Sequence, residues 1–140
     1  MKDFVHRLHH VGVVVNDLQA SLDWYRDKLG FEHQYSFTLP GAQVAMLVRG
    51  EARLEIFQVE GAAPMASERE DIETLLKRGG VNHFALNVDE LEETIAALAA
   101  KGVEIVIPPS SVPNHSGDRF AYIRDNDRML VELFQSASRE

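Results

Sequence analysis

The chain has 140 residues, of which 45% are hydrophobic and 26% charged, and it contains no cysteine. This composition is typical of a globular domain and excludes disulfides, thiol catalysis and thiolate metal ligands. The net charge is −8 with scattered basic residues, so we expect no nucleic-acid partner. An apolar run of about 18 residues and a signal-peptide pattern are both absent, so we expect no membrane partner and a cytoplasmic location.

The first half of the chain predicts a strand, a helix and three further strands. Residues 10–15 predict the first strand, and apolar residues at helical spacing from Leu18 predict a helix that ends at Gly30. Asn16 is the expected start of a capping box for that helix. Further strands are predicted over residues 32–38, 44–49 and 53–59.

The second half repeats the same order of signals. Residues 83–91 (HFALNVDEL) follow residues 10–18 (HVGVVVNDL) at an offset of 73 positions. They predict a strand and a helix with a capping box at Asp89. Strands are then expected over residues 104–107, 119–124 and 129–135. The last strand of each half carries apolar-Glu-apolar-Phe-Gln, which indicates that the two halves are copies of one unit.

The predicted fold is therefore α+β. We expect two tandem βαβββ modules that are related by a pseudo-twofold axis and form a cupped mixed β-sheet with the helices outside. Residues 1–140 are expected to form a single domain, with module one over about 5–60 and module two over about 81–136. A linker helix is predicted over about 67–79, and residues 108–118 are predicted to be a loop.

Four residues stand at matched positions of the two modules: His10, Glu55, His83 and Glu132. Taken singly, a strand histidine is usually structural and a strand glutamate is usually solvated. Their repetition favours a shared site, because the pseudo-twofold would bring all four together. Two imidazoles and two carboxylates suit one divalent metal ion such as Ni, Co, Zn, Mn or Fe.

Two stretches carry a resemblance to a known family. Residues 10–18, followed by residues 24–31 (WYRDKLGF), resemble the opening of the vicinal oxygen chelate superfamily, which is the glyoxalase/bleomycin resistance/dioxygenase family. Residues 124–133 (RDNDRMLVEL) resemble its terminal turn and metal-binding strand, with Arg128 where that turn commonly has glycine. The resemblance implies the βαβββ fold over nearly the whole chain.

The resemblance also implies a metal set and a chemistry. His10, Glu55, His83 and Glu132 match the metal ligands of a glyoxalase I-like member, and His10 is preferred to His9 because only His10 aligns with His83. We expect a metal-dependent lyase or isomerase that acts on a small α-keto or α-hydroxy carbonyl adduct through a metal-stabilised enediolate. Glu132 is the first choice for the catalytic base and Glu55 the second, whereas the substrate-binding residues are left unassigned.

Two alternatives stay open. The first is an epimerase that resembles methylmalonyl-CoA epimerase, but such enzymes typically have glutamine in place of Glu55, and residues 39–43 lack their additional glutamate base. The second is a non-catalytic protein that binds a small molecule or confers resistance. In each case a small molecule is the expected ligand and a homodimer the expected assembly, with the site within one chain.

Overall fold

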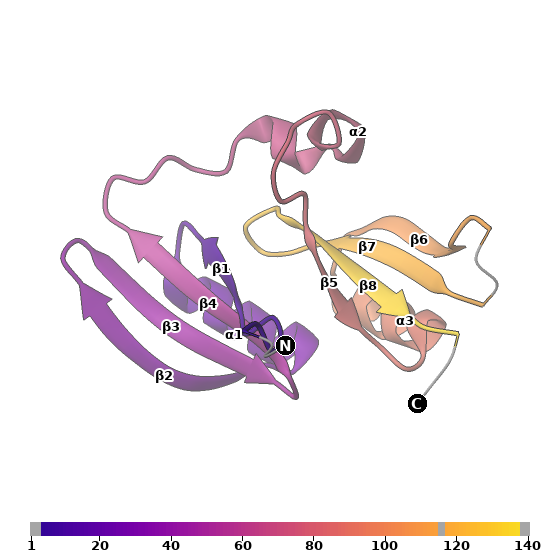
Figure 1. The fold of residues 1–140 in the computed structure, drawn as a ribbon, viewed down its shortest axis with the longest axis horizontal. Helices are drawn as coiled ribbons and strands as arrows, with labels where there is room; N and C mark the ends of the chain where they lie inside the picture. The colour runs from indigo at the N-terminus through magenta and orange to yellow at the C-terminus, as the bar shows by residue number, and fades with distance from the viewer. Residues whose placement is uncertain (1–3, 115–116, 138–140) are drawn as a thin grey trace. The chain divides into compact units, whose positions relative to one another are not determined.

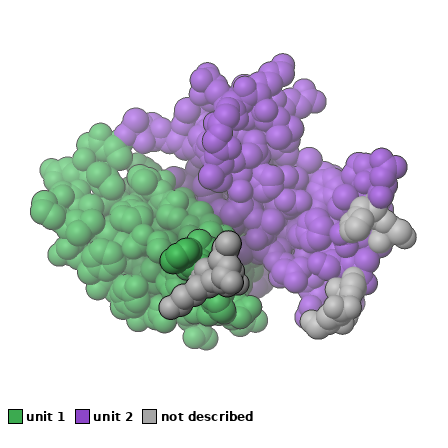
Figure 2. Space-filling model, viewed as in Figure 1, with its two compact units in different colours: residues 1–62 green, residues 63–140 purple. Residues whose placement is uncertain are grey.

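The computed structural model describes residues 4–114 and 117–137. The chain divides into two compact units, residues 1–62 (unit 1) and residues 63–140 (unit 2), which Figure 2 shows in different colours. Each unit contains one βαβββ module with a four-stranded mixed sheet. The predicted α+β fold of tandem modules is therefore confirmed.

Unit 1 consists of one sheet with a helix against one of its faces (Figure 1). Its elements are β1 (Val11–Val14), α1 (Leu18–Leu29), β2 (Glu32–Leu39), β3 (Ala42–Arg49) and β4 (Ala52–Val59). The strand order is β1-β4-β3-β2, with β1 parallel to β4 and the other pairs antiparallel. The β2 strand is therefore an edge strand.

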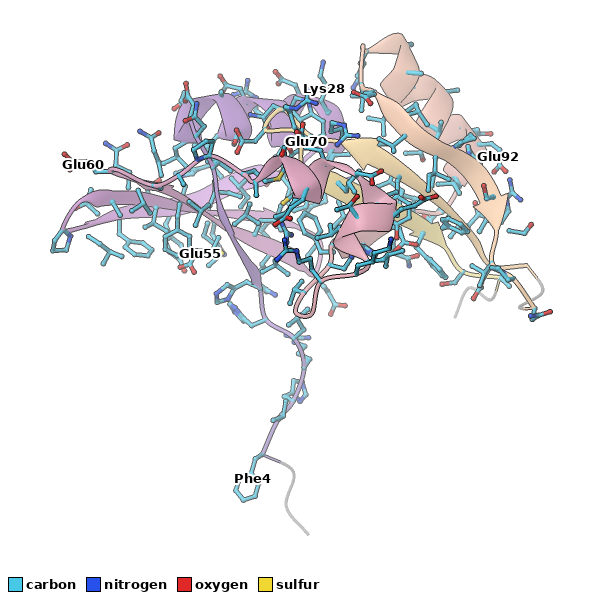
Figure 3. The ribbon with its side chains drawn as sticks, turned by 90° about the horizontal axis from the view of Figure 1, so that it is seen from above. Phe4, Lys28, Glu55, Glu60, Glu70 and Glu92 are labelled. Atoms are coloured by element: carbon cyan, nitrogen blue, oxygen red, sulfur yellow. The ribbon has the colours of Figure 1, made fainter. Side chains whose placement is uncertain are left out.

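The core of unit 1 lies between the sheet and α1. Tyr25 of α1 is buried, as are Leu54 and Ile56 of β4. Because side chains alternate along a strand, Glu55 between these two residues must point to the opposite face. Figure 3 shows Glu55 on the side of the sheet away from α1. We call this side the open face of unit 1.

Unit 2 repeats the arrangement. Its module consists of β5 (Phe84–Asn87), α3 (Leu91–Ala100), β6 (Ile105–Ser111), β7 (Arg119–Arg124) and β8 (Leu130–Gln135). The strand order is β5-β8-β7-β6, again with one parallel pair, β5 and β8. Buried Val131 and Leu133 alternate with the half-buried Glu132, so Glu132 lies on the open face of unit 2, away from α3.

The segment before the second module is less helical than expected. In place of one helix over about 67–79, a 3₁₀ turn (Ser67–Glu70) is followed by the one-turn helix α2 (Ile72–Leu75). Asp71 separates the two because its backbone is extended, with φ −108° and ψ 121°. Its carboxylate then accepts a hydrogen bond from the backbone N–H of Thr74 and caps α2.

Part of the loop expected over residues 108–118 is strand. The β6 strand continues to Ser111 and includes Pro108 and Pro109. Proline lacks a backbone N–H, but β6 is an edge strand and tolerates that loss. Irregular pairing between Ile107 and Ser110 accompanies the two prolines. Residues 115–116 of the expected loop lie outside the described part of the chain.

The described residues contain no helix that is both long enough and apolar enough to cross a bilayer.

Candidate metal centre

The first histidine and glutamate pair lies on the open face of unit 1. Gly12 of β1 is in register with Glu55 of β4, and His10 precedes Gly12 by two positions. The His10 Nε2 atom is 3.3 Å from Glu55 Oε1. The side chain of His10 is 37% exposed and that of Glu55 is 18% exposed, so the pair is accessible to a small ligand.

The second pair occupies the equivalent place in unit 2. Ala85 of β5 is in register with Glu132 of β8, and His83 precedes Ala85 by two positions. The His83 Nε2 atom is 2.7 Å from Glu132 Oε1. The structure thus brings together His10 with Glu55 and His83 with Glu132, each within its own unit.

Tyr122 joins His83 and Glu132 in unit 2, although it was not among the residues predicted for the site. It lies on β7 directly opposite Glu132, and its hydroxyl oxygen is 3.0 Å from His83 Nε2. Burial raises the pKa of Tyr122 to about 12, and the charge of Glu132 and a hydrogen bond to it act in the same direction. Tyr122 is therefore a protonated donor at neutral pH, shared between two acceptors.

The two units differ at this position. In unit 1 the residue directly opposite Glu55 on β3 is Met46, which is buried. A thioether cannot donate a hydrogen bond to the carboxylate. Tyr122 would have been found only by aligning β3 of the first module with β7 of the second and asking which residue pairs with each glutamate.

The residue immediately before each histidine contacts Nδ1, the ring nitrogen that does not face the glutamate. Asn82 Oδ1 is 2.6 Å from His83 Nδ1, and His9 Nδ1 is 2.9 Å from His10 Nδ1. In both units the Nε2 atom is consequently the one that faces the carboxylate.

The donor chemistry of these pairs suits a divalent cation. An amide oxygen only accepts, so Asn82 Oδ1 requires the donor to be Nδ1–H of His83. In the neutral ring the lone pair of Nε2 is then directed at Glu132, whose Oε1 atom is 2.7 Å away. The Tyr122 hydroxyl is the proton donor that both atoms share, and a cation can take its place between them. Imidazole and carboxylate are ligands that Zn²⁺ and related ions accept.

Each unit offers two ligands rather than a complete set. Over residues 4–114 and 117–137, no group of three or more histidine, aspartate and glutamate side chains is spaced to hold a metal ion.

A family model provides the decisive comparison. The model of the Glyoxalase/Bleomycin resistance protein/Dioxygenase superfamily matches residues 7–133. The chain belongs to this superfamily. The match spans both units, and the region between residues 7 and 133 contains both histidine and glutamate pairs. The resemblance noted from residues 10–18 and 24–31 is thus confirmed at the level of the superfamily.

Individual members of the superfamily share fewer than a third of their residues with this chain. The mitochondrial methylmalonyl-CoA epimerase of Mus musculus is 28% identical over 135 residues, which cover 93% of this chain and 73% of the mouse protein. A glyoxalase family protein of Enterococcus faecalis has a TM-score of 0.72 at 29% identity, covering 91% of this chain and 96% of that one. The trypanothione-dependent glyoxalase I of Leishmania major shares the fold, with a TM-score of 0.70 at 20% identity over 94% of this chain and 87% of that one.

Proposed function

We propose that this protein is a metal-dependent lyase or isomerase that resembles glyoxalase I and acts on a small α-keto or α-hydroxy carbonyl adduct. The observation that carries this proposal is the duplicated pair, with His10 and Glu55 at 3.3 Å in unit 1 and His83 and Glu132 at 2.7 Å in unit 2. One isolated pair has an ordinary structural explanation. Two pairs at matched register positions of a repeated module favour a shared ligand.

In this proposal His10, Glu55, His83 and Glu132 of one chain hold one divalent ion, and the chain forms a homodimer. The two imidazoles are neutral, so the two carboxylates offset the charge of the divalent ion. When bound, the ion would act as a Lewis acid on vicinal substrate oxygens and acidify the adjacent C–H bond.

The proton transfers fall to the two carboxylates. Glu132 is the proposed base: it removes the proton from carbon and returns the same proton to the neighbouring carbon, and Glu55 is the second choice for this role. The Tyr122 hydroxyl lies within reach of both Glu132 and His83. With the His83 Nε2 lone pair committed to the ion, the hydroxyl is left to donate to Glu132 and to orient that carboxylate.

The open face of unit 1 offers an apolar surface beside Glu55. Tyr35, Phe37 and Leu39 of β2 are 49%, 38% and 47% exposed, although each is a large hydrophobic side chain. Tyr35 is in register with Met46, which is in register with Glu55, so these side chains share the face of the first pair. We assign them to the apolar part of the substrate and to the exclusion of water.

An epimerase is the second candidate, because the mouse relative is a methylmalonyl-CoA epimerase. Both reactions begin with proton removal from carbon beside a carbonyl, and the same pairs would serve either one. Glu55 favours the lyase or isomerase, since the resemblance gives epimerases a glutamine there.

Turnover and isotope exchange test the proposal together. The protein would be loaded separately with Ni²⁺, Co²⁺, Zn²⁺, Mn²⁺ or Fe²⁺ and given hemithioacetals of an α-ketoaldehyde with several thiols, or methylmalonyl-CoA, in deuterated water. We expect turnover of a hemithioacetal, and Glu132→Gln should lower it by about 10²- to 10⁴-fold. The control is His33→Ala. His33 hydrogen-bonds to Ser36 and lines a pocket with Gln19 and Asp23 of α1, so it belongs to neither histidine and glutamate pair.

Two results would contradict the proposal. Turnover of methylmalonyl-CoA without any turnover of hemithioacetals would establish the epimerase instead. Stoichiometric binding of an adduct with neither turnover nor deuterium exchange would favour a binding protein.

A further inference from the structure

The residue immediately before each ligand histidine contacts that histidine in the same way. Asn82 and His9 stand 73 positions apart, the same offset that separates His83 from His10. Each reaches the Nδ1 atom of the next residue, at 2.6 Å for Asn82 and 2.9 Å for His9. The contact is thus duplicated with the module, although the two residue types differ.

Local backbone structure explains how neighbours meet. Within a strand, successive side chains point to opposite faces and do not touch. Residues 9–10 and 82–83, however, lie just before the strands that begin at Val11 and Phe84. They lie outside the strand pairing of the sheets, and in each pair the two side chains contact one another.

The contact in unit 2 determines which ring nitrogen is left for a ligand. Because the Asn82 oxygen can only accept, a neutral His83 must carry its hydrogen on Nδ1. Its Nε2 lone pair is then directed at Glu132. The opposite tautomer would place a hydrogen on Nε2 and block coordination.

The contact in unit 1 joins two ring nitrogens, so one must donate and the other accept. If His10 donates from Nδ1 to His9 Nδ1, then the His10 Nε2 lone pair faces Glu55, as in unit 2. The His9 and His10 rings meet edge to face, with an interplanar angle of 87°. Perpendicular rings permit an N–H in the plane of one ring to meet the in-plane lone pair of the other ring's nitrogen.

We propose that Asn82 and His9 are positioning residues that fix the tautomer and ring orientation of the two metal-binding histidines. This inference rests on the proposed metal site for its functional consequence. Partners of this kind are worth about 10- to 100-fold in metal affinity. Asn82 is half-buried and its backbone carbonyl accepts a hydrogen bond from Arg69, whereas His9 is exposed. The loss should therefore be greater for Asn82→Ala than for His9→Ala.

The first measurement uses metal-free protein. Two-bond ¹H–¹⁵N spectra of the imidazole rings report the tautomer of each histidine, and they are recorded well above the ordinary imidazole pKa range. We expect Nδ1–H for His83 and His10 in the unsubstituted protein, with a mixture of tautomers at His83 in Asn82→Ala and at His10 in His9→Ala. An unchanged tautomer in both variants would overturn the inference.

The second measurement is Co²⁺ binding, followed by the visible absorption of the bound ion. Asn82→Ala and His9→Ala should weaken binding, whereas the exchanges His9→Asn and Asn82→His should retain it because each installs the other module's residue. His6→Ala is the control at an exposed histidine of the same N-terminal segment. Full affinity in both alanine variants would also overturn the inference, with the proposed metal site intact.

The two measurements separate the two proposals. Wild-type protein that fixes both tautomers but binds no Co²⁺ would retain the positioning roles of Asn82 and His9 and contradict the proposed function. Thermal unfolding of each variant shows that any change arises in a folded protein.

Discussion

Gln58 caps the start of α1. Its Oε1 atom accepts a hydrogen bond from the backbone N–H of Leu18 at 2.7 Å. In unit 2, Gln135 does the same for Leu91 at the start of α3, also at 2.7 Å. The final strand of each module thus satisfies a free N–H group of that module's helix, which explains why both copies have glutamine at this position.

We predict that Gln58→Ala and Gln135→Ala each lower the free energy of unfolding by about 1–3 kcal/mol, because a part-buried donor loses its acceptor. Denaturant unfolding measures the effect. Gln43→Ala, at an exposed position of β3, should change stability by less than about 0.5 kcal/mol. If Gln58→Ala lowers the free energy of unfolding no more than Gln43→Ala does, the capping hydrogen bond contributes nothing to stability.

Arg128 adopts a backbone conformation that favours glycine. Its φ is 71°, in the turn between β7 and β8, and its side chain pairs with Glu70. We predict that Arg128→Gly is more stable than Arg128→Ala by about 1 kcal/mol, because both variants lose the ion pair but only glycine relieves the left-handed strain. Thermal unfolding of the two variants provides the test, and equal stability would contradict it.

Tyr122 gives the protein a pH dependence in alkaline solution. Its pKa is raised to about 12 in the folded protein, against 10.0 for an ordinary tyrosine. Its protonated form therefore contributes stability that is complete below about pH 10 and is lost as the pH rises through about 12.

We predict that Tyr122→Phe removes the phenolate absorbance that develops near pH 12. Glu132→Gln should shift that titration to lower pH, because it removes a negative charge beside the hydroxyl. It should remain above the ordinary value, since burial is the larger cause. Ultraviolet absorbance titration measures both effects, and a Tyr122 that titrates near pH 10 would contradict this account.

The sequence predicted the fold through its repeat. Helical spacing from Leu18 and matched strands indicated both modules, and the repeat placed Glu55 and Glu132 at equivalent positions of the last strands. Capping was less certain at the level of single residues. The predicted capping residues were Asn16 and Asp89, whereas the N-cap positions are Asp17 and Glu90, one position later. Asp17 accepts a hydrogen bond from the backbone N–H of Ala20, and Glu90 makes no side-chain capping bond.

The partners of the site were harder to predict. Tyr122 acts through its register with Glu132, and register depends on turn geometry that the sequence does not specify. Asn82 and His9 contact the histidines just before the strands begin, and a strand boundary to that accuracy is set by tertiary pairing. The helix expected over 67–79 is interrupted at Asp71 for a local reason: capping by Asp71 outweighs the apolar spacing.

The central claim is that one divalent ion is held by both units of a single chain. Elemental analysis of protein purified without a histidine tag and reconstituted with Ni²⁺ or Co²⁺ tests it most directly. We predict about one ion per chain, lost in each of His10→Ala, Glu55→Gln, His83→Ala and Glu132→Gln, and retained in His33→Ala. Protein that binds no ion, or that keeps its ion when either residue of the unit 1 pair is replaced, would contradict the claim.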